Sequence, residues 1–260
     1  MPNFAANLTM LFNEVPVEER FQAAAEAGFE AVEILFPDAL PPEEFARQLQ
    51  DNGLKLALFN VARGDWDAGE RGISALPGRE DDFQNALDQA LSYARATRPK
   101  NVHVMAGIVE GGLSDTAAVE TFCANLHAAA EAFAEEGVGV VIEPLNTRAA
   151  PGYLMSKQGE AREIIERVGH ANIGLQFDIF HAQIMEGDVA MRLREFMPII
   201  GHIQIAGVPE RHEPDTGELN YPYLFDLLDE LGYTGWVGCE YQPRTTTLDG
   251  LGWFKRGASK

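Results

Sequence analysis

Short runs of apolar, β-branched and aromatic residues alternate with longer stretches of helical periodicity along the whole chain. The apolar runs cover residues 4–8, 31–35, 54–60, 101–105, 138–143, 172–178, 199–206 and 235–241. The helical stretches that follow them cover residues 16–27, 42–52, 80–98, 115–136, 157–168, 180–196, 221–232 and 246–254. Several runs are almost continuously apolar, as expected for parallel strands covered on both faces. Eight strand–helix units in 260 residues predict a single (β/α)₈ barrel domain spanning residues 1–260.

The alternative arrangement of the same units is a doubly wound open sheet. That fold commonly carries a Gly-x-Gly-x-x-Gly turn after its first strand, where a dinucleotide binds. No such turn follows the first predicted strand, which favours the barrel. Helix boundaries carry local signals as well: residues 114–115 offer an N-cap, and Gly28, Gly53 and Gly232 follow helical stretches as stops.

Two connections are longer than the others, at residues 61–80 and 207–222. Each follows a predicted strand and precedes a helix, so in a barrel both would lie on the face where active sites are found. Their glycine, proline and charged residues are typical of lids or substrate loops.

The charge balance narrows the choice of partners. Forty acidic and twenty basic residues give a net charge of −20 at pH 7. A chain without a basic cluster repels phosphates, so we expect neither nucleic acid nor an anionic membrane as a partner. No basic segment precedes an apolar core near the N-terminus, and no apolar run approaches about eighteen residues, so we expect a cytoplasmic protein. Cys123 and Cys239 have no metal-ligand spacing and are expected to pack as core thiols.

Polar side chains stand at the ends of the last four predicted strands. Glu143, Asp178 and Glu240 are carboxylates, and Gln204 adds an amide oxygen near the end of the seventh strand. One such residue alone is commonly a helix N-cap or the partner of a loop arginine. In a barrel, however, the ends of all strands gather at one rim, where three carboxylates repel one another unless a cation lies between them. Oxygen ligands without thiolates suit a hard divalent ion, and we expect Mg²⁺ or Mn²⁺.

A divalent ion flanked by two glutamates suggests a reaction. The ion can polarise the carbonyl of an α-hydroxycarbonyl compound and stabilise the enediolate formed when a proton leaves carbon. One glutamate can remove that proton, and the other can return a proton to the former carbonyl carbon. The pattern therefore predicts aldose–ketose isomerisation, or epimerisation when the proton returns to the same carbon on its opposite face.

The chain that carries these residues resembles the hydroxypyruvate isomerase family, within the xylose isomerase-like barrel superfamily. The resemblance covers nearly the whole chain and is carried by FAANLTMLF, GDWDAGERGISALPGRE, IEPLN, FDIFHAQIMEGD, GHIQIAG, HEPDTGELNYPYLF, GYTGWVGCEY and GLGWF. It implies Glu143 and Glu240 as the catalytic pair, and both of them with Asp178 and Gln204 as the metal ligands. The implied reaction converts hydroxypyruvate to 2-hydroxy-3-oxopropanoate.

The related 2-oxo-tetronate isomerase branch is similar too. The segments LALFN, NVHVMAG and HIQIAGVPERHEP resemble that branch, whereas IEPLN is closer to the hydroxypyruvate branch. The two substrates share a 2-oxo-3-hydroxy acid core and differ by one hydroxymethyl group. That difference is worth only about 1–3 kcal/mol in a pocket, so both substrates remain open.

A second set of residues is expected to contact the substrate. His181 follows Asp178 by three positions, and in the wider sugar-epimerase superfamily a histidine at this spacing contacts substrate oxygens. Arg211 is our candidate for the substrate carboxylate, because a guanidinium can bind a carboxylate through two hydrogen bonds. Arg63 and Arg71, in the long third connection, compete with Arg211 for that role.

The remaining polar candidates lie in the first half of the chain. Asn7 and Asn60, at the ends of the first and third predicted strands, are candidates for donating to the substrate, although such an asparagine also caps turns. Glu33 and His103 lie inside predicted strands, and we expect both to be satisfied polar residues of the core. Trp66 and Trp236 are expected to pack, with a place in the pocket wall as the alternative.

Three other functions compete with the isomerase. An apurinic endonuclease would need several zinc ions, many histidines and a basic face, which this chain lacks. A ketose 3-epimerase also uses two glutamates and a metal, but its third ligand is typically histidine where this chain has Gln204. The non-enzymatic alternative is a barrel that binds a sugar acid without converting it. A homodimer or tetramer would be ordinary for an enzyme of this kind.

Overall fold

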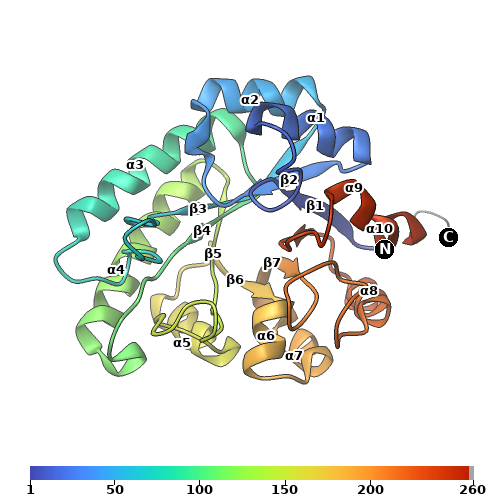
Figure 1. Cartoon of the computed structure of the whole chain (residues 1–260). Coiled ribbons are helices and arrows are strands. Elements are labelled where there is room, and N and C mark those ends of the chain that lie inside the picture. The colour runs from blue at the N-terminus through green and yellow to red at the C-terminus, as the bar shows by residue number, and fades with distance from the viewer. Residues whose placement is uncertain (258–260) are drawn as a thin grey trace.

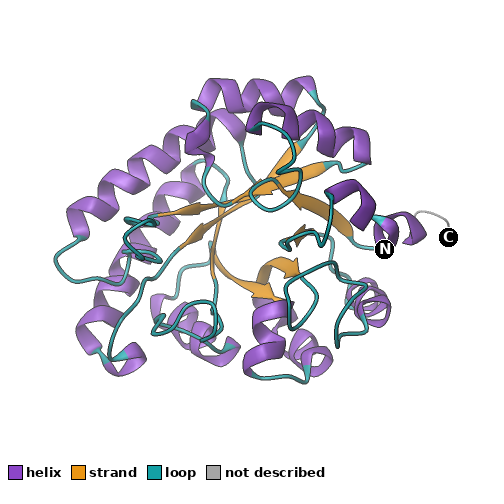
Figure 2. Cartoon of the chain, in the orientation of Figure 1, coloured by secondary structure: helices purple, strands orange, loops and turns teal. Residues whose placement is uncertain are grey.

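The chain forms a closed barrel of eight parallel strands surrounded by helices, as predicted. The computed structural model describes residues 1–257. Each strand pairs with its neighbours in sequence, and β8 closes the barrel by pairing with β1. Figures 1 and 2 show the strands at the centre and the helices outside them. The strands are β1 (Asn3–Asn7), β2 (Ala31–Ile34), β3 (Lys55–Val61), β4 (Asn101–Val104), β5 (Gly139–Ile142), β6 (Ile173–Asp178), β7 (Ile200–Ile205) and β8 (Trp236–Cys239).

The outer layer follows the predicted helices closely in the first five units. The α-helices are α1 (Val17–Ala27), α2 (Pro42–Asp51), α3 (Glu80–Thr97), α4 (Thr116–Glu135), α5 (Gln158–Val168), α6 (Ile179–Met185), α7 (Val189–Phe196), α8 (Tyr221–Glu230), α9 (Thr247–Gly250) and α10 (Gly252–Gly257). Asp115 caps α4 by accepting from the backbone of Ala118, and Gly28 ends α1 in the left-handed region. Among the described residues, no helix is long and apolar enough to cross a membrane.

Two predicted helices are each divided in two. The stretch 180–196 forms α6 and α7, because Gly187 and Asp188 have φ of 66° and 50° and a right-handed helix cannot continue through them. The stretch 246–254 likewise forms α9 and α10, which are separated at Leu251. Helix α6 also starts one residue earlier than predicted, at Ile179, because Asp178 is its N-cap.

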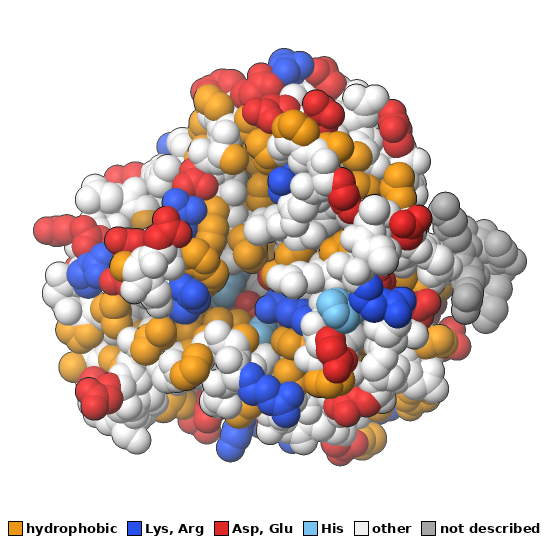
Figure 3. Space-filling view, in the orientation of Figure 1, with side chains coloured by type: hydrophobic (Ala, Val, Ile, Leu, Met, Phe, Trp, Pro, Cys, Tyr) orange, Lys and Arg blue, Asp and Glu red, His pale blue; other side chains and the backbone are white. Residues whose placement is uncertain are grey.

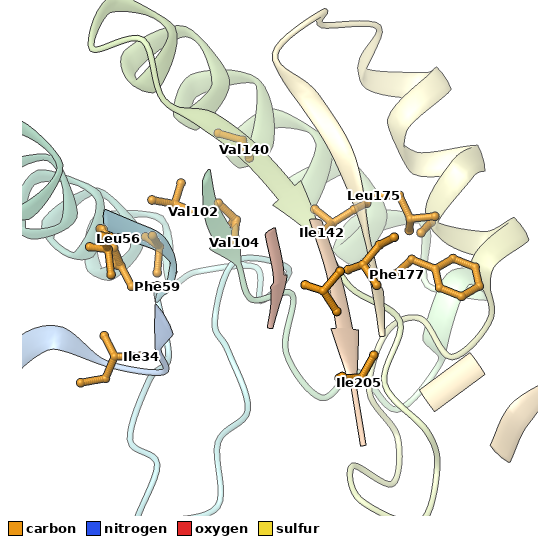
Figure 4. Packing of buried hydrophobic residues seen from close by; sticks show 14 of the residues in the cluster. Ile34, Leu56, Phe59, Val102, Val104, Val140, Ile142, Leu175, Phe177 and Ile205 are labelled. Carbon is orange, nitrogen blue, oxygen red and sulfur yellow. The ribbon is translucent and has the colours of Figure 1, made fainter. Parts of the chain in front are cut away.

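The hydrophobic core lies between the strands and the helices. Strand residues such as Val102, Val140, Leu175 and Phe177 are fully buried there (Figure 4). Alternate strand positions point into the barrel, where small and polar side chains replace the apolar residues expected on both faces. Ala5, Ala31 and Ala57 fill one end of the interior and pack against Trp236.

A glutamate occupies the middle of the barrel, where an apolar side chain would otherwise pack. Glu33 accepts hydrogen bonds from Asn7 Nδ2 and Gln204 Nε2, each at 2.9 Å, and its other oxygen lies 2.8 Å from His202 Nε2. Gly238 provides the space, because a Cβ there would overlap the Glu33 carboxylate. Glu33 is therefore a satisfied core residue, as predicted.

Candidate active site

Two glutamates, from strands that are separated by two others in the barrel, line one cavity at the carboxyl ends of the strands. Glu143 directly follows β5 and Glu240 directly follows β8. The cavity has a volume of about 230 Å³, below the roughly 300–1,000 Å³ usual for drug-sized ligands, and so suits a small substrate. Its ionisable lining consists of Arg71, His103, Glu143, His181, Arg211 and Glu240. In Figure 3, acidic and histidine atoms lie in the hollow near the centre of this face, with basic side chains along its edge.

The carboxylates are buried and electrostatically frustrated. Burial raises the pKa of Glu143 well above its usual value, and the nearby charges of Glu240 and Asp178 raise it further. Burial likewise raises the pKa of Glu240 to about 8 and that of Asp178 to about 6, although Arg211 partly opposes both shifts. Within the described part of the chain, Glu143 Oε1 and Asp178 Oδ2 have no hydrogen-bond partner. Buried carboxylate oxygens without partners, beside other carboxylates, form a donor set that fits a hard divalent cation.

Asp178 and Glu240 also have the structural roles that a single strand-end acid commonly has. Asp178 Oδ1 accepts from the backbone N–H of Phe180 at 2.8 Å and so caps α6. Glu240 Oε2 accepts from Arg211 Nη2 at 2.8 Å. Each carboxylate keeps a second oxygen, so these roles and a place in a cation site are compatible.

His181 lies against the carboxylates in a defined tautomer. Its Nδ1 accepts from the backbone N–H of Asn146 at 2.9 Å, so in the neutral ring the proton is on Nε2. Burial lowers the pKa of His181 well below its usual value, with Arg211 and His103 lowering it further, and the ring is therefore neutral. Its Nε2 lies 3.4 Å from Asp178 Oδ2 and 4.0 Å from Glu143 Oε1.

Two roles are geometrically open to His181. Ligand atoms of Glu143, Asp178 and His181 all lie within 4.8 Å of one another, so these three could hold a metal ion. Metal ligation by Nε2 would need its lone pair, however, and the hydrogen bond from Asn146 places a proton there. An Nε2–H donor suits a substrate oxygen better, in keeping with the predicted substrate contact.

Gln204 is buried beside these residues but its amide is already bonded. Its Oε1 accepts from Gln176 Nε2 at 2.6 Å, and its Nε2 donates to Glu33. Gln204 does not line the cavity. The amide oxygen retains a second lone pair, so metal ligation by Gln204 stays a prediction.

The two predicted asparagines differ. Asn60 lines the cavity, with Oδ1 at 3.2 Å from His103 Nδ1. Asn7 does not line it, because its Nδ2 donates to Glu33 while its Oδ1 accepts from the backbone of Thr9. Asn60 therefore belongs to the cavity wall and Asn7 does not, and a contact of either with a substrate stays a prediction.

The prediction that His103 is a satisfied core residue is wrong. Its Nδ1 faces two oxygens, Asn60 Oδ1 and, at 3.6 Å, Glu143 Oε2, and so carries the proton of the neutral ring. Burial lowers the pKa of His103 to about 3, with a further contribution from His202. Its Nε2 is buried without a partner among the described residues, and the side chain lines the cavity. The sequence did hold a signal for this position. His103 lies between Val102 and Val104, and because these valines face the helices, strand alternation points His103 into the barrel.

The comparisons with known proteins agree with this geometry. Residues 21–257 match the family described as the xylose isomerase-like TIM barrel. The 2-oxo-tetronate isomerase of Cupriavidus necator is 54% identical, covering 98% of each chain. The hydroxypyruvate isomerase of Escherichia coli is 42% identical, again covering 98% of each chain.

A solved structure is similar over the same length. The crystal structure titled AP endonuclease, family 2, from Brucella melitensis superimposes with a TM-score of 0.96 at 50% identity, covering 98% of this chain and 99% of that one. The chain therefore belongs to the xylose isomerase-like TIM barrel family.

Proposed function

We propose that this protein is an isomerase that interconverts a small 2-oxo-3-hydroxy acid and its 2-hydroxy-3-oxo isomer. The observation that carries the proposal is the pair of buried glutamates, Glu143 and Glu240, lining one small cavity at the barrel mouth. Relatives named as isomerases of such acids, at 42–54% identity over nearly the whole chain, support it.

The favoured substrate is 2-oxo-tetronate. Three relatives that carry this activity in their names are 54%, 49% and 47% identical to the chain. Hydroxypyruvate, the substrate that the family resemblance implies, is the second candidate, supported by the Escherichia coli enzyme at 42% identity. Both acids contain the same reacting carbons, so one site can act on either.

The proposed reaction is a proton transfer between neighbouring carbons. One glutamate removes the proton from C3, which bears the hydroxyl group, and the C2 carbonyl oxygen gains a proton as the enediol forms. The other glutamate then returns a proton to C2 while the C3 oxygen loses its own proton and becomes the carbonyl. No atom is gained or lost. Neutral His181, whose Nε2–H faces this region, would orient a substrate oxygen by donating a hydrogen bond to it.

The site is proposed to hold Mg²⁺ or Mn²⁺. Glu143, Asp178, Gln204 and Glu240 are the proposed ligands, and the oxygens of the first two that have no hydrogen-bond partner among the described residues support this assignment. When bound, the ion supplies a Lewis acid that polarises the substrate carbonyl. A cation would also offset the mutual repulsion of the carboxylates. A cytoplasmic location and a homo-oligomeric state remain predictions.

A substrate panel tests the proposal. The rate of conversion is measured for 2-oxo-tetronate, for hydroxypyruvate and for a neutral ketohexose, each with Mg²⁺, with Mn²⁺ and with a chelator. We expect both acids to be converted when metal is present, with kcat/KM for 2-oxo-tetronate higher by about 10–100-fold, the usual scale for one added group in a pocket. Preference for the ketohexose would identify an epimerase instead. Binding of the acids without conversion of any of them would identify a non-enzymatic barrel.

A further inference from the structure

The loop that connects β3 to α3, residues 62–79, forms one wall of the cavity. Trp66 and Arg71 line the cavity from this loop, whereas the glutamates come from the ends of β5 and β8. The loop is held in place by Gly72, which forms an isolated bridge with Ala106 just beyond β4. Arg71 therefore belongs to a part of the wall that the barrel itself positions.

Arg71 is oriented by its own loop. Its guanidinium stacks on the Trp66 ring, 4.0 Å from the ring centroid. Its Nη1 donates to the backbone oxygens of Glu70 at 2.7 Å and Trp66 at 3.2 Å. These bonds leave Nε and Nη2, the edge through which a guanidinium binds a carboxylate with two parallel hydrogen bonds. Because the side chain is already ordered, little conformational entropy would be lost on binding.

The two competing arginines, Arg211 and Arg63, already bind carboxylates of the protein. Arg211 donates from Nη2 to Glu240 Oε2 at 2.8 Å and from Nε to the Glu240 backbone oxygen at 3.3 Å. Arg63 forms an ion pair with Asp38 at 2.7 Å and does not line the cavity. Of the arginines that line this cavity in the described chain, Arg71 has no carboxylate within ion-pair distance.

We propose that Arg71 binds the carboxylate of the substrate and so makes the site selective for sugar acids over neutral ketoses. This inference rests on the proposed function, because it assigns one end of the same substrate. It revises the sequence-based assignment of that role to Arg211, which the geometry instead joins to Glu240. A substrate anion entering among buried carboxylates needs a cation at its far end, whereas a neutral ketose does not.

Steady-state kinetics on both acids, with Mg²⁺ present, test the role of Arg71. In Arg71→Gln we expect KM to rise about 10–100-fold, the scale for losing a pair of hydrogen bonds to a charged group, and kcat to stay within about threefold. Arg71→Lys keeps the charge without the paired donors, so its KM should fall between the two. Arg63→Gln is the matched control in the same loop and should stay within about twofold of the parent.

A binding measurement separates this inference from the proposed function. Glycerate carries the carboxylate and two hydroxyls but no ketone or aldehyde carbonyl, so it cannot be isomerised, and glycerol is its neutral counterpart. Calorimetry with the Mn²⁺-loaded protein should show glycerate binding tighter than glycerol in the parent, with the difference lost in Arg71→Gln. If the parent converts neither acid yet shows this loss, the proposed function fails and the role of Arg71 stands.

Two results would overturn the inference. One is parental KM and parental glycerate binding in Arg71→Gln while the parent is active. The other is loss of glycerate selectivity in Arg211→Gln but not in Arg71→Gln, which would place the carboxylate at Arg211. If Arg71→Gln unfolds at lower urea concentration than the parent, Arg71→Lys decides instead: a raised KM supports the role, and a parental KM refutes it.

Discussion

Substituting Gly72 by alanine should displace the wall that carries Arg71. Gly72 has φ of 114°, and a Cβ added there would lie 2.6 Å from the backbone oxygen of Met105 and 2.7 Å from its carbonyl carbon. Backbone atoms cannot rotate away as a side-chain end can, so the loop or the segment after β4 must move. We therefore expect Gly72→Ala to be less stable than the parent and to bind the substrate more weakly.

A second glycine of the same loop allows the magnitude to be worked out. Gly69 has φ of 95°, and no other atom of the described part of the chain lies within 4 Å of an added Cβ. Alanine at either position bears a backbone strain of roughly 1–3 kcal/mol, offset in both cases by the reduced entropy of the unfolded chain. The difference between the two variants therefore isolates the steric clash, which for overpacking is about 1–3 kcal/mol.

Urea unfolding and kinetics together measure these effects. The free energy of unfolding should be lower in Gly72→Ala than in Gly69→Ala by about 1–3 kcal/mol. KM should rise in Gly72→Ala and stay near the parental value in Gly69→Ala, because only the first moves Arg71. Equal stabilities and equal KM values in the two variants would refute the close approach of Gly72 to Met105 and its link to the site.

The remaining predictions concern the carboxylates. Asp178→Ala should lose Mn²⁺ binding in calorimetry while remaining folded, and parental Mn²⁺ affinity would remove Asp178 from the ligand set. Glu143→Gln and Glu240→Gln should each lower turnover by about 10²–10⁴-fold. Because both residues act on one proton path, the double variant should be little worse than the poorer single variant. Near-parental turnover in either single variant would mean that its glutamate transfers no proton. In the chelated protein the raised pKa values of Asp178, about 6, and Glu240, about 8, exceed their unfolded values, so the folded state binds more protons and stability should fall as pH rises through this range. The Tm of the chelated protein should therefore be lower at pH 8 than at pH 5, and adding Mn²⁺ at pH 8 should raise it again. A Tm that changes with neither pH nor Mn²⁺ would contradict the mutual repulsion of these buried carboxylates.

The barrel could be predicted because its signals are local. Each apolar run and the helical stretch after it form one unit, and closing eight such units places all carboxyl ends of the strands at one rim. That topology alone indicates that Glu143 and Glu240 lie at one rim, although 97 residues separate them in the chain. The break at Gly187 and Asp188 was not predicted, because helical periodicity continues on both sides of it.

The finer assignments depended on side-chain directions that spacing does not reveal. His103 was assigned to the core because it lies within a strand, yet the alternation of the strand turns it into the barrel, where no residue between 1 and 257 bonds its Nε2. Arg211 was preferred to Arg71 from sequence although both lie in long loops, whose side-chain contacts spacing does not predict. The conformation of these loops decides the contacts: Arg211 bonds to Glu240, whereas Arg71 stacks on Trp66.

The most direct test of the central claim, proton transfer between two glutamates, is the fate of hydrogen at C2 of the product. The Mg²⁺-loaded protein is given 2-oxo-tetronate, and separately hydroxypyruvate, in D₂O, and the product is analysed by NMR at low conversion. Because one glutamate removes the C3 proton and a different glutamate, which exchanges with solvent, protonates C2, we predict close to one deuterium at C2. Protium retained at C2 would contradict the account, since it would mean that the same hydrogen moves from C3 to C2, carried by a single base or shifted as hydride.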